Sequence, residues 1–554
     1  MRLTPRLAAA FVTAFLMLAP TIGRALADDK KDDKKDDKKE EKAATAADKE
    51  KALYADSTTQ GTVDVGGQHI AYTAVVGTLT VASNDSDDAQ LGLDGKPLPG
   101  TQLALDEPKE PKDANPTARI SYVAYFKKDA KAEDRPIMFF YNGGPGAASV
   151  WLHMGSLGPK HVVTEGDQHL PAAPYKLLDN PYSLLDSSDL VFIDMPGTGF
   201  GRLLGKDPGK AFWGIDEDAN AFARFIVRFI TKFDRWNSPK FLFGESYGTT
   251  RSAVLADILE NDKSVDLNGV ILLSQIFNFT TDIDVPAANP GVDLPYLLAL
   301  PTYAATAWYH KKLPNQPPAI EPFLKEVEEY AMGPYTHALA LGTDLSDSEK
   351  QTVAERLHEY TGIPVAYWIK ANLRVSGGEF TKTLQDDQNL TTGRLDTRYS
   401  GPTLDPLSEG AEYDPQSSAI SSAYVSLFND YVRRELKYGE GQTYLDHALF
   451  SGVQWDTKHN GMTISTNVTN DLAEALKTNP RLRVMVNGGY YDLATPFFAA
   501  QYEDKHLPIP QSLAKNIEYD WYESGHMVYV RDESLKQLHD RVAAFIKSTL
   551  SDAK

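Results

Sequence analysis

The prediction of the fold begins from residues 241–248, which read Phe241-Leu242-Phe243-Gly244-Glu245-Ser246-Tyr247-Gly248. Its first three residues predict a short buried strand, and the Gly-x-Ser-x-Gly pattern that follows is typical of a tight turn into a helix. Such a turn exposes the serine hydroxyl above the end of the sheet. The pattern also fits an ordinary turn of small residues, so a catalytic interpretation needs support from the rest of the chain.

Several other segments predict buried strands of the same kind. These short apolar runs occupy residues 137–141, 190–193, 270–273, 482–486 and 517–521. Between them, apolar residues recur at helical spacing, for example from Ala219 to Phe233. Short apolar strands that alternate with amphipathic helices indicate a mostly parallel sheet covered on both faces. We therefore predict an α/β protein, specifically an α/β-hydrolase fold with a mostly parallel central sheet flanked by helices.

The segments around this core suggest how the chain is divided. Residues 62–76 predict a hairpin, residues 83–116 a long loop or lid, and residues 120–126 a half-buried strand. Residues 289–466 break the strand–helix alternation and are rich in aromatic residues and helix formers, which indicates a largely helical cap insertion. We therefore predict residues 57–288 as the first part of the core, 289–466 as the cap and 467–554 as the second part of the core.

The N-terminal residues predict export. Arg2 and Arg6 precede a 12-residue apolar run, and Ala25-Leu26-Ala27 supplies a small-x-small cleavage site. The run is shorter than the roughly 20 residues needed to span a bilayer. We therefore predict a signal peptide at residues 1–27 and a periplasmic or extracellular protein, with an uncleaved anchor as the alternative. Residues 28–56 begin with an unbroken charged run and predict a solvated, disordered tether. No integral membrane span is expected after signal removal: residues 295–310 are apolar but too short, and Pro301 interrupts them.

The composition excludes several classes of protein. The sequence contains 42% hydrophobic and 24% charged residues, which is typical of a globular chain. Cysteine is absent, which excludes disulfides, thiolate nucleophiles and cysteine-ligated metals. Acidic residues outnumber basic ones by 76 to 56, giving a net charge of −20, and this balance argues against a nucleic-acid partner.

A serine nucleophile needs a base, and the base needs a carboxylate to orient it. In this fold the chain order is serine, acid, histidine. Asp492 follows the predicted strand at 482–486, where a residue at the top of the sheet belongs. Of the later histidines, only His526 follows a strand and a turn; His539 lies in a helical run and is predicted to be an ordinary surface histidine. We therefore predict a triad of Ser246, Asp492 and His526.

Acyl transfer also needs hydrogen-bond donors for the developing oxyanion. The backbone N–H of Tyr247, directly after the nucleophile, is one expected donor. The glycine-rich loop at residues 142–146 follows an earlier strand and fits the second, although by itself it fits a simple turn equally well.

The sequence resembles a known family, the serine carboxypeptidases, over residues 118–547. The blocks that carry the resemblance are Asn142-Gly143-Gly144-Pro145-Gly146, Asp194-x-Pro196-Gly197-Thr198-Gly199-Phe200, Gly244-Glu245-Ser246-Tyr247-Gly248, Asn487-Gly488-Gly489-Tyr490-Tyr491-Asp492 and Gly525-His526-Met527. The resemblance implies that the Gly144 and Tyr247 amides form the oxyanion hole, and that Asn142 and Glu245 bind the terminal carboxylate of a peptide substrate. It implies no metal and no cofactor.

Two positions depart from the family pattern. The family commonly has Glu-x-Gly-Pro after the asparagine loop, where this chain has Ser156-Leu157-Gly158-Pro159. One of two paired carboxyl groups is therefore missing, and we expect activity over a broader or higher pH range than an acid optimum. Relatives often carry a cysteine where this chain has Ala147, and the cysteine-free pattern resembles the exported bacterial branch.

Three functions are compatible with these residues. The first is an exported serine carboxypeptidase that releases C-terminal residues from peptides through an acyl-enzyme. The second is an esterase or acyltransferase that uses the same triad. The third is an interaction protein with a vestigial site, which is disfavoured because every expected catalytic position is occupied. The sequence predicts neither the side-chain preference nor the oligomeric state.

Overall fold

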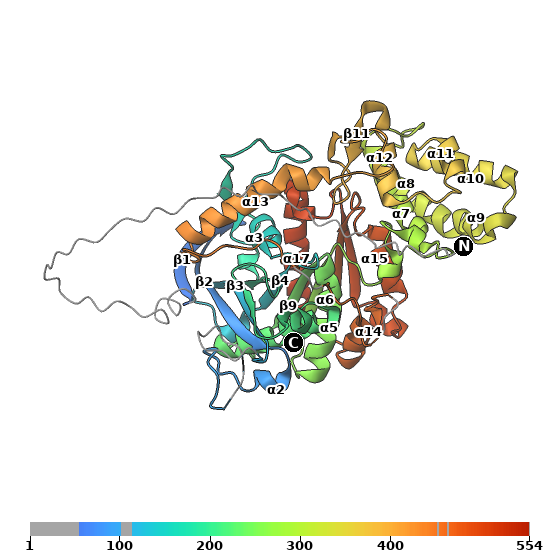
Figure 1. Ribbon diagram of the computed structural model, residues 1–554. Coiled ribbons are helices and arrows are strands. Elements are labelled where there is room, and N and C mark those ends of the chain that lie inside the picture. The colour runs from blue at the N-terminus through green and yellow to red at the C-terminus, as the bar shows by residue number, and fades with distance from the viewer. Residues whose placement is uncertain (1–54, 101–102, 104–112, 451–453, 462–464, 553–554) are drawn as a thin grey trace, which may run out of the picture. The chain divides into compact units, whose positions relative to one another are not determined.

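The strands predicted around Ser246 form the centre of one large sheet in the computed structural model, which describes residues 55–100, 103, 113–450, 454–461 and 465–552 (Figure 1). Within those residues the sheet has ten strands in the order β1-β2-β3-β7-β4-β9-β10-β13-β14, with β8 beside β3. Their bounds are β1 (Ser57–Val65), β2 (Gln68–Ala82), β3 (Thr117–Lys127), β4 (Ile137–Tyr141), β7 (Asp189–Ile193), β8 (Arg202–Leu204), β9 (Lys240–Glu245), β10 (Gly269–Leu273), β13 (Arg483–Gly489) and β14 (Ile517–Tyr522). Two small hairpins pair β5 (Lys160–Val162) with β6 (Leu177–Asp179), and β11 (Leu390–Thr392) with β12 (Ser400–Pro402).

The direction of the strands confirms the predicted fold class. From β7 to β14 every neighbouring pair in the sheet is parallel. The first strands are antiparallel to their neighbours, and β1 and β2 form the predicted hairpin, which turns at residues 66–67. This mostly parallel sheet, with helices on both faces, is an α/β-hydrolase fold.

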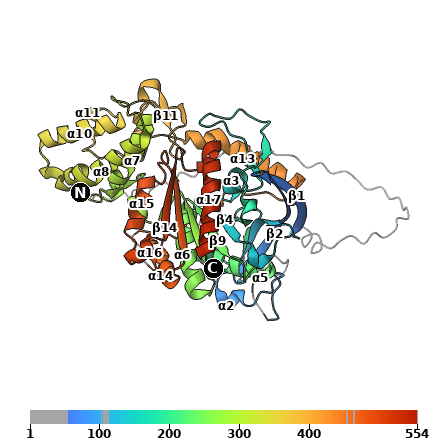
Figure 2. The same ribbon diagram turned by 180° about the vertical axis from the view of Figure 1, so that it is seen from behind.

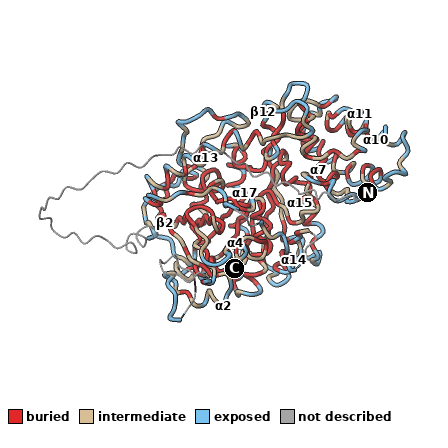
Figure 3. The backbone as a smooth tube through the Cα atoms, in the orientation of Figure 1, coloured by how far each residue is buried: buried red, intermediate tan, exposed pale blue. Residues whose placement is uncertain are grey.

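Alternate residues of the central strands belong to two separate apolar layers, one on each face of the sheet. In β4, Met138 and Phe140 belong to one layer, whereas Phe139 belongs to the other. The first layer also contains helices α3 (Val150–Gly155), α13 (Pro415–Arg434) and α17 (Asp532–Asp552), and the second contains α5 (Ile215–Lys232), α6 (Tyr247–Asp257) and α14 (Thr469–Thr478). This alternation follows from the strand period of two, and apolar residues at every position allow both faces to be buried. Figure 2 shows α17 in front of the sheet. Figure 3 shows that the buried residues concentrate in the interior of the molecule.

The two segments predicted as core contain the helices that come before residue 289 and after residue 466. They are α2 (Asp85–Asp88), α3 (Val150–Gly155), α4 (Pro208–Phe212), α5 (Ile215–Lys232), α6 (Tyr247–Asp257), α14 (Thr469–Thr478), α15 (Phe497–Lys505), α16 (Gln511–Ala514) and α17 (Asp532–Asp552). The acidic first turn of α5 and its nearly continuous buried face explain why the sequence folds as a helix there.

The segment predicted as a cap is helical over much of its described length. It contains α7 (Leu294–Tyr309), α8 (Ile320–Tyr330), α9 (Thr336–Leu341), α10 (Asp347–Thr361), α11 (Val365–Lys370), α12 (Gly377–Thr383) and α13 (Pro415–Arg434). Helices α7 to α12 gather to one side of the sheet, whereas α13 lies across α3 (Figure 1). The expectation that Pro301 interrupts residues 295–310 was wrong: α7 continues through it, because dense burial on all sides outweighs the lost backbone hydrogen bond.

Two predictions concern segments that are partly or wholly outside the described residues. The predicted signal peptide (1–27) and almost all of the predicted tether (28–56) are outside them. In the predicted loop 83–116, the described residues around α2 are fixed to α5: Arg228 bonds to both carboxylate oxygens of Asp88, and Arg224 pairs with Asp85. Among the described residues, no helix is both long and apolar enough to cross a bilayer. The boundaries at 288/289 and 466/467 remain predictions.

Candidate active site

The carboxyl ends of the parallel strands meet at one edge of the sheet, and the predicted site residues lie there. The chain passes from β4 to β7 on one side of β4, and then to β9 on its other side. In open α/β sheets ligands bind in the crevice at such a switch point. Asn142 follows β4, Ser246 follows β9, and Asp492 and His526 follow β13 and β14.

Ser246 occupies a strained turn between β9 and α6. Its backbone has φ 62° and ψ −130°, a conformation that L-amino acids rarely adopt and that costs about 1–3 kcal/mol. Its side chain is half-buried, unlike its fully packed neighbours in β9. This is the geometry that the Gly-x-Ser-x-Gly pattern predicts: the hydroxyl is held out of the helix at the end of a rigid strand.

Asp492 and His526 form a buried pair. Nδ1 of His526 donates to Oδ2 of Asp492 at 2.8 Å, and both side chains are almost completely buried. Thr495 donates to the same carboxylate from its backbone N–H at 3.0 Å and from its hydroxyl at 2.7 Å. Burial opposes the charged imidazolium, but the charge of Asp492 and the hydrogen bond to it outweigh this and raise the pKa of His526. Nε2, the other ring nitrogen, is thereby left to act as the base.

The end of β10 ties the serine and the histidine together. The backbone N–H of Ser246 donates to the carbonyl of Leu273 at 2.9 Å, and the hydroxyl of the next residue, Ser274, donates to the carbonyl of His526 at 2.7 Å. The consecutive residues Leu273 and Ser274 thus bond to the loops of Ser246 and His526, and Asp492 is bonded to His526 in turn. The loops that carry the three predicted residues therefore meet at one edge of the sheet, and Asp492 and His526 are in direct contact.

The glycine-rich loop after β4 packs directly against the start of α6. A Cβ atom at Gly143 would lie 2.4 Å from the amide nitrogen of Tyr247, so only glycine permits this approach. Arg251, one turn into α6, donates to the carbonyl of Asn142 at 2.8 Å and forms a fully buried ion pair with Asp218. The loop that carries Gly144 and the amide of Tyr247 are thus fixed side by side.

The Asp194 motif supports the same loop from the other side. The buried carboxylate of Asp194 accepts hydrogen bonds from the backbone N–H of Ser149 at 2.9 Å and from the hydroxyl of Ser121 at 2.7 Å. Burial raises its pKa to about 6. Since the Ser149 hydroxyl accepts from the N–H of Asn142 at 3.3 Å, Asp194 acts on the loop through Ser149.

Asn142 and Glu245 lie together, near the predicted triad residues His526 and Asp492. Oδ1 of Asn142 accepts from the N–H of Leu152 at 3.0 Å, and its side chain also interacts with the carboxyl group of Glu245. Glu245 is 3% exposed, and burial raises its pKa to about 7, even though the nearby His526 charge acts in the opposite direction. A carboxyl group with this pKa carries a proton in a large fraction of molecules at neutral pH, so it can donate a hydrogen bond to an anion.

Residues 395–398, in the predicted cap, contact the loops that carry Asp492 and His526. Backbone N–H groups join this segment to both loops: His526 donates to the carbonyl of Leu395 at 2.7 Å, and Thr397 donates to that of Tyr491 at 2.9 Å. The segment therefore lies between the loop that carries Asp492 and the loop that carries His526.

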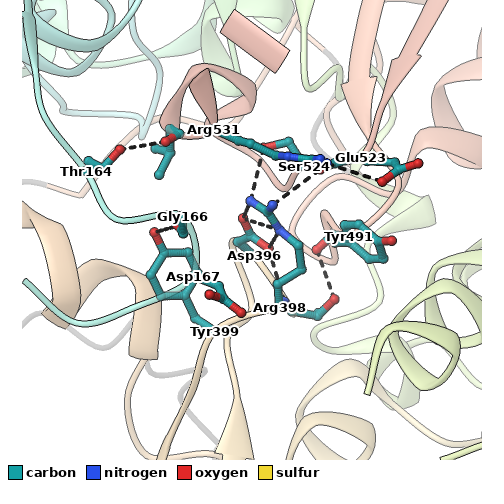
Figure 4. Close-up of polar contacts among 12 residues, drawn as sticks. Thr164, Gly166, Asp167, Asp396, Arg398, Tyr399, Tyr491, Glu523, Ser524 and Arg531 are labelled. Atoms are coloured by element: carbon teal, nitrogen blue, oxygen red, sulfur yellow. Dashed lines mark hydrogen bonds and ion pairs between the residues drawn. The ribbon is translucent and has the colours of Figure 1, made fainter. Parts of the chain in front are cut away.

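Side chains of this segment complete the support (Figure 4). Arg398 forms a two-pronged pair with the fully buried Asp396, at 2.6 Å and 2.9 Å. The same guanidinium donates to the hydroxyl of Ser524 at 3.2 Å and to the carbonyl of Glu523 at 3.3 Å. Arg398 thus fixes the two residues that come just before the loop of His526. Neither Asp396 nor Arg398 was predicted from the sequence to be a site residue.

Two further points concern the other titratable groups. The prediction that His539 is an ordinary surface histidine was wrong: it lies on the inner face of α17, 8% exposed, with Nε2 3.2 Å from the carboxylate of Asp186. Among the described residues, no group of three or more histidine, aspartate and glutamate side chains is arranged to hold a metal ion.

Comparison with known proteins identifies similar sequences and structures. The profile of the serine carboxypeptidase family matches residues 113–537. The chain is 26% identical over 162 residues to serine carboxypeptidase-like 36 of Arabidopsis thaliana, covering 28% of this chain and 32% of that protein. It is 31% identical over 144 residues to the pheromone-processing carboxypeptidase KEX1 of Saccharomyces cerevisiae, covering 24% of this chain and 18% of that protein.

Among solved structures, the chain is similar to a prohormone-processing carboxypeptidase from Saccharomyces cerevisiae, with a TM-score of 0.48 and 15% identity, covering 86% of this chain and 91% of that one. The matches to the curated relatives named above span a third or less of the relatives' length. The family profile, in contrast, covers most of this sequence. This protein belongs to the serine carboxypeptidase family.

Proposed function

We propose that this protein is a serine carboxypeptidase that removes C-terminal residues from peptides through an acyl-enzyme on Ser246. The observation that carries the proposal is the position of Glu245: a buried carboxyl group with a pKa of about 7, in contact with Asn142 and adjacent in sequence to the nucleophile. A group that accommodates a terminal carboxylate next to the nucleophile favours cleavage of the last peptide bond.

The proposed reaction begins with attack of the Ser246 hydroxyl on the carbonyl carbon of that bond. Nε2 of His526 accepts the hydroxyl proton, and Asp492 stabilises the resulting imidazolium. The amides of Gly144 and Tyr247 donate to the oxyanion, each contributing about 2.7–4 kcal/mol of barrier reduction. The imidazolium then protonates the leaving amino group, and a water molecule, activated by the same histidine, hydrolyses the acyl-enzyme and restores the serine.

The substrate carboxylate and Glu245 can approach only if they share a proton, because two negative charges in a buried site repel. Protonated Glu245 donates to the carboxylate, and the side-chain amide of Asn142 is the second proposed donor. A substrate without a free carboxylate leaves these buried polar groups unpaired, which is the physical origin of the expected selectivity.

The test compares three substrates: a blocked dipeptide, its C-terminal amide and a simple ester. The proposal predicts that kcat/KM for the free acid exceeds that for the amide by at least about 10³-fold, because a site built for a polar group rejects the analogue that lacks it. Turnover of the ester with no preference for the free acid would indicate an esterase or acyltransferase.

Asn142→Ala supplies a check on the carboxylate site. We expect it to lower kcat/KM for peptides more than for esters, since esters make no use of the carboxylate contact. Equal losses on both substrates would mean that Asn142 is structural, through its bond to the N–H of Leu152.

We also propose that the protein is exported to the periplasm or the medium, as in the cysteine-free bacterial branch of the family. The support is the sequence pattern of residues 1–27: a basic start, a short apolar run and a small-x-small cleavage site. Detection of the mature protein outside the cytoplasm, with its N-terminus at Asp28, tests this proposal.

A further inference from the structure

The position at which the family commonly has a second glutamate is occupied here by Ser156, and its side chain is engaged elsewhere. Ser156 directly follows the last residue of α3 and is completely buried. Its hydroxyl donates to the carbonyl of Leu152 in that helix at 2.6 Å. The serine is therefore not a substitute partner for Glu245.

A tyrosine takes that partner's place from a different part of the chain. The hydroxyl of Tyr529, three residues after His526, donates to Oε2 of Glu245 at 2.8 Å. Tyr529 is 2% exposed, and its hydroxyl also interacts with the side chain of Asn142. Tyr529 thus faces both residues of the proposed carboxylate site.

The neighbour of Ser156 makes room for this ring. A Cβ atom at Gly155 would lie 2.7 Å from two carbon atoms of the Tyr529 ring and 2.6 Å from the hydroxyl of Tyr424. Any larger residue at position 155 would therefore displace the tyrosine. The small residues at 155 and 156 and the aromatic residue at 529 form one packed unit around Glu245.

We infer that Tyr529 is a positioning residue for recognition of the substrate carboxylate: its hydroxyl orients Glu245 by occupying Oε2 and leaves Oε1 to face the substrate. The inference rests on the proposed carboxypeptidase function and deepens it. A phenol at this position donates a hydrogen bond but carries no charge across the working pH range, unlike a second carboxyl group. The site therefore needs one shared proton, between Glu245 and the substrate, and none between two glutamates.

Several groups raise or lower the pKa of Glu245, and the direction of each effect determines the result that the test should give. Burial raises its pKa; the charge of His526 and the hydrogen bonds from Tyr529 and Asn142 lower it, whereas the charge of Asp492 raises it. Tyr424, on α13, also lies within electrostatic range. Because the tyrosine hydroxyl stabilises the ionised form, its removal raises the pKa of Glu245 further.

Tyr529→Phe keeps the ring and removes only the hydroxyl. For a free-acid peptide we expect two effects: kcat/KM falls about threefold to tenfold at pH 6, where a positioning hydrogen bond is lost, and the alkaline limb of its pH profile moves to higher pH. For the ester, we expect neither effect. Gly155→Ala, which pushes the ring away, should reproduce the loss on the peptide. Tyr431→Phe, which removes a buried hydrogen bond of 3.0 Å to Tyr125 in the same apolar layer, is the matched control and should leave both profiles unchanged.

The outcome that overturns the inference is an unshifted alkaline limb in Tyr529→Phe, or equal losses on peptide and ester. A second measurement separates this inference from the proposed function. Infrared titration of the Glu245 carboxyl band, assigned with Glu245→Gln, requires no substrate. If the wild-type protein shows no preference for free acids, the proposed function fails, and the infrared shift between wild type and Tyr529→Phe still decides whether Tyr529 controls Glu245.

Discussion

Nδ1 of His526 lies 2.8 Å from Oδ2 of Asp492, although 34 residues separate them and each follows a different strand. The pair exists because β13 and β14 are parallel neighbours, so their carboxyl ends deliver the two side chains to the same edge of the sheet. The hydrogen bond fixes the ring so that Nε2 is the nitrogen left for proton transfer.

Asp492→Asn should therefore abolish most of the activity without unfolding the protein. The amide keeps an oxygen for Thr495 but presents N–H to Nδ1, which forces the wrong tautomer of His526 and should lower kcat by about 10⁴-fold. Steady-state kinetics on the ester and the peptide measure this, with a thermal melt as the control for folding. A loss of less than tenfold would show that Asp492 does not orient the histidine.

The pH dependence should differ between substrates. Activity on both substrates requires neutral His526 and therefore falls as the pH drops through its raised pKa. Only free-acid peptides also require protonated Glu245, so their kcat/KM should fall as the pH rises above about 7, whereas that for esters continues on a plateau. Parallel pH profiles check this. Activity confined to strongly acid pH would contradict the expectation of a broader or higher pH range, which follows from Ser156 in place of a second glutamate.

Removal of Arg398 should destabilise the protein more than removal of the whole ion pair. Arg398→Met leaves the fully buried carboxylate of Asp396 without its partner, which should lower the free energy of unfolding by about 3–5 kcal/mol. Asp396→Asn combined with Arg398→Met removes the uncompensated charge and should recover part of that loss. Urea unfolding measures both. A double variant no more stable than the single one would mean that the guanidinium stabilises the His526 loop independently of Asp396.

A second charged cluster should make stability depend on pH in the alkaline range. His459 lies between Asp216 at 2.7 Å and Asp471 at 2.8 Å, in the first turns of α5 and α14. Burial opposes its charge, but the two hydrogen-bonded carboxylates raise its pKa to about 9.

Because this folded-state pKa is higher than that of the unfolded chain, the stabilisation is complete below about pH 6.5 and is lost as the pH rises through about 9. His459→Gln should therefore lower the free energy of unfolding by on the order of 2 kcal/mol at pH 6, and by much less at pH 10. The same loss at both pH values would contradict a charged histidine.

Much of the fold was predictable because the central strands are apolar on both faces. The runs predicted at 137–141 and 517–521 match β4 and β14 to within one residue. The short strands β5, β6, β8, β11 and β12 were missed, because three residues carry no detectable period. His539 was assigned to the surface, although its spacing from Leu535 and Leu538, one turn and one residue away on the buried face of α17, was the available signal.

The site was predictable where a residue follows a strand and a special turn, as Ser246 and His526 do. Tyr529 and Arg398 were not, because their roles depend on contacts that no local pattern encodes. Tyr529 meets a glutamate 284 residues away, and Arg398 belongs to a segment outside the strand–helix alternation. A buried tyrosine in an apolar stretch is, from its sequence alone, indistinguishable from a core residue.

A rapid-quench experiment tests directly whether Ser246 is the nucleophile. It uses a blocked peptide that has a free C-terminal carboxylate, and the digested protein is analysed by mass spectrometry. We expect an acyl group on the tryptic peptide that contains Ser246, formed at the rate of release of the C-terminal amino acid and absent from Ser246→Ala. Release of that amino acid by Ser246→Ala at the wild-type rate, or an acyl group at another residue, would contradict this expectation.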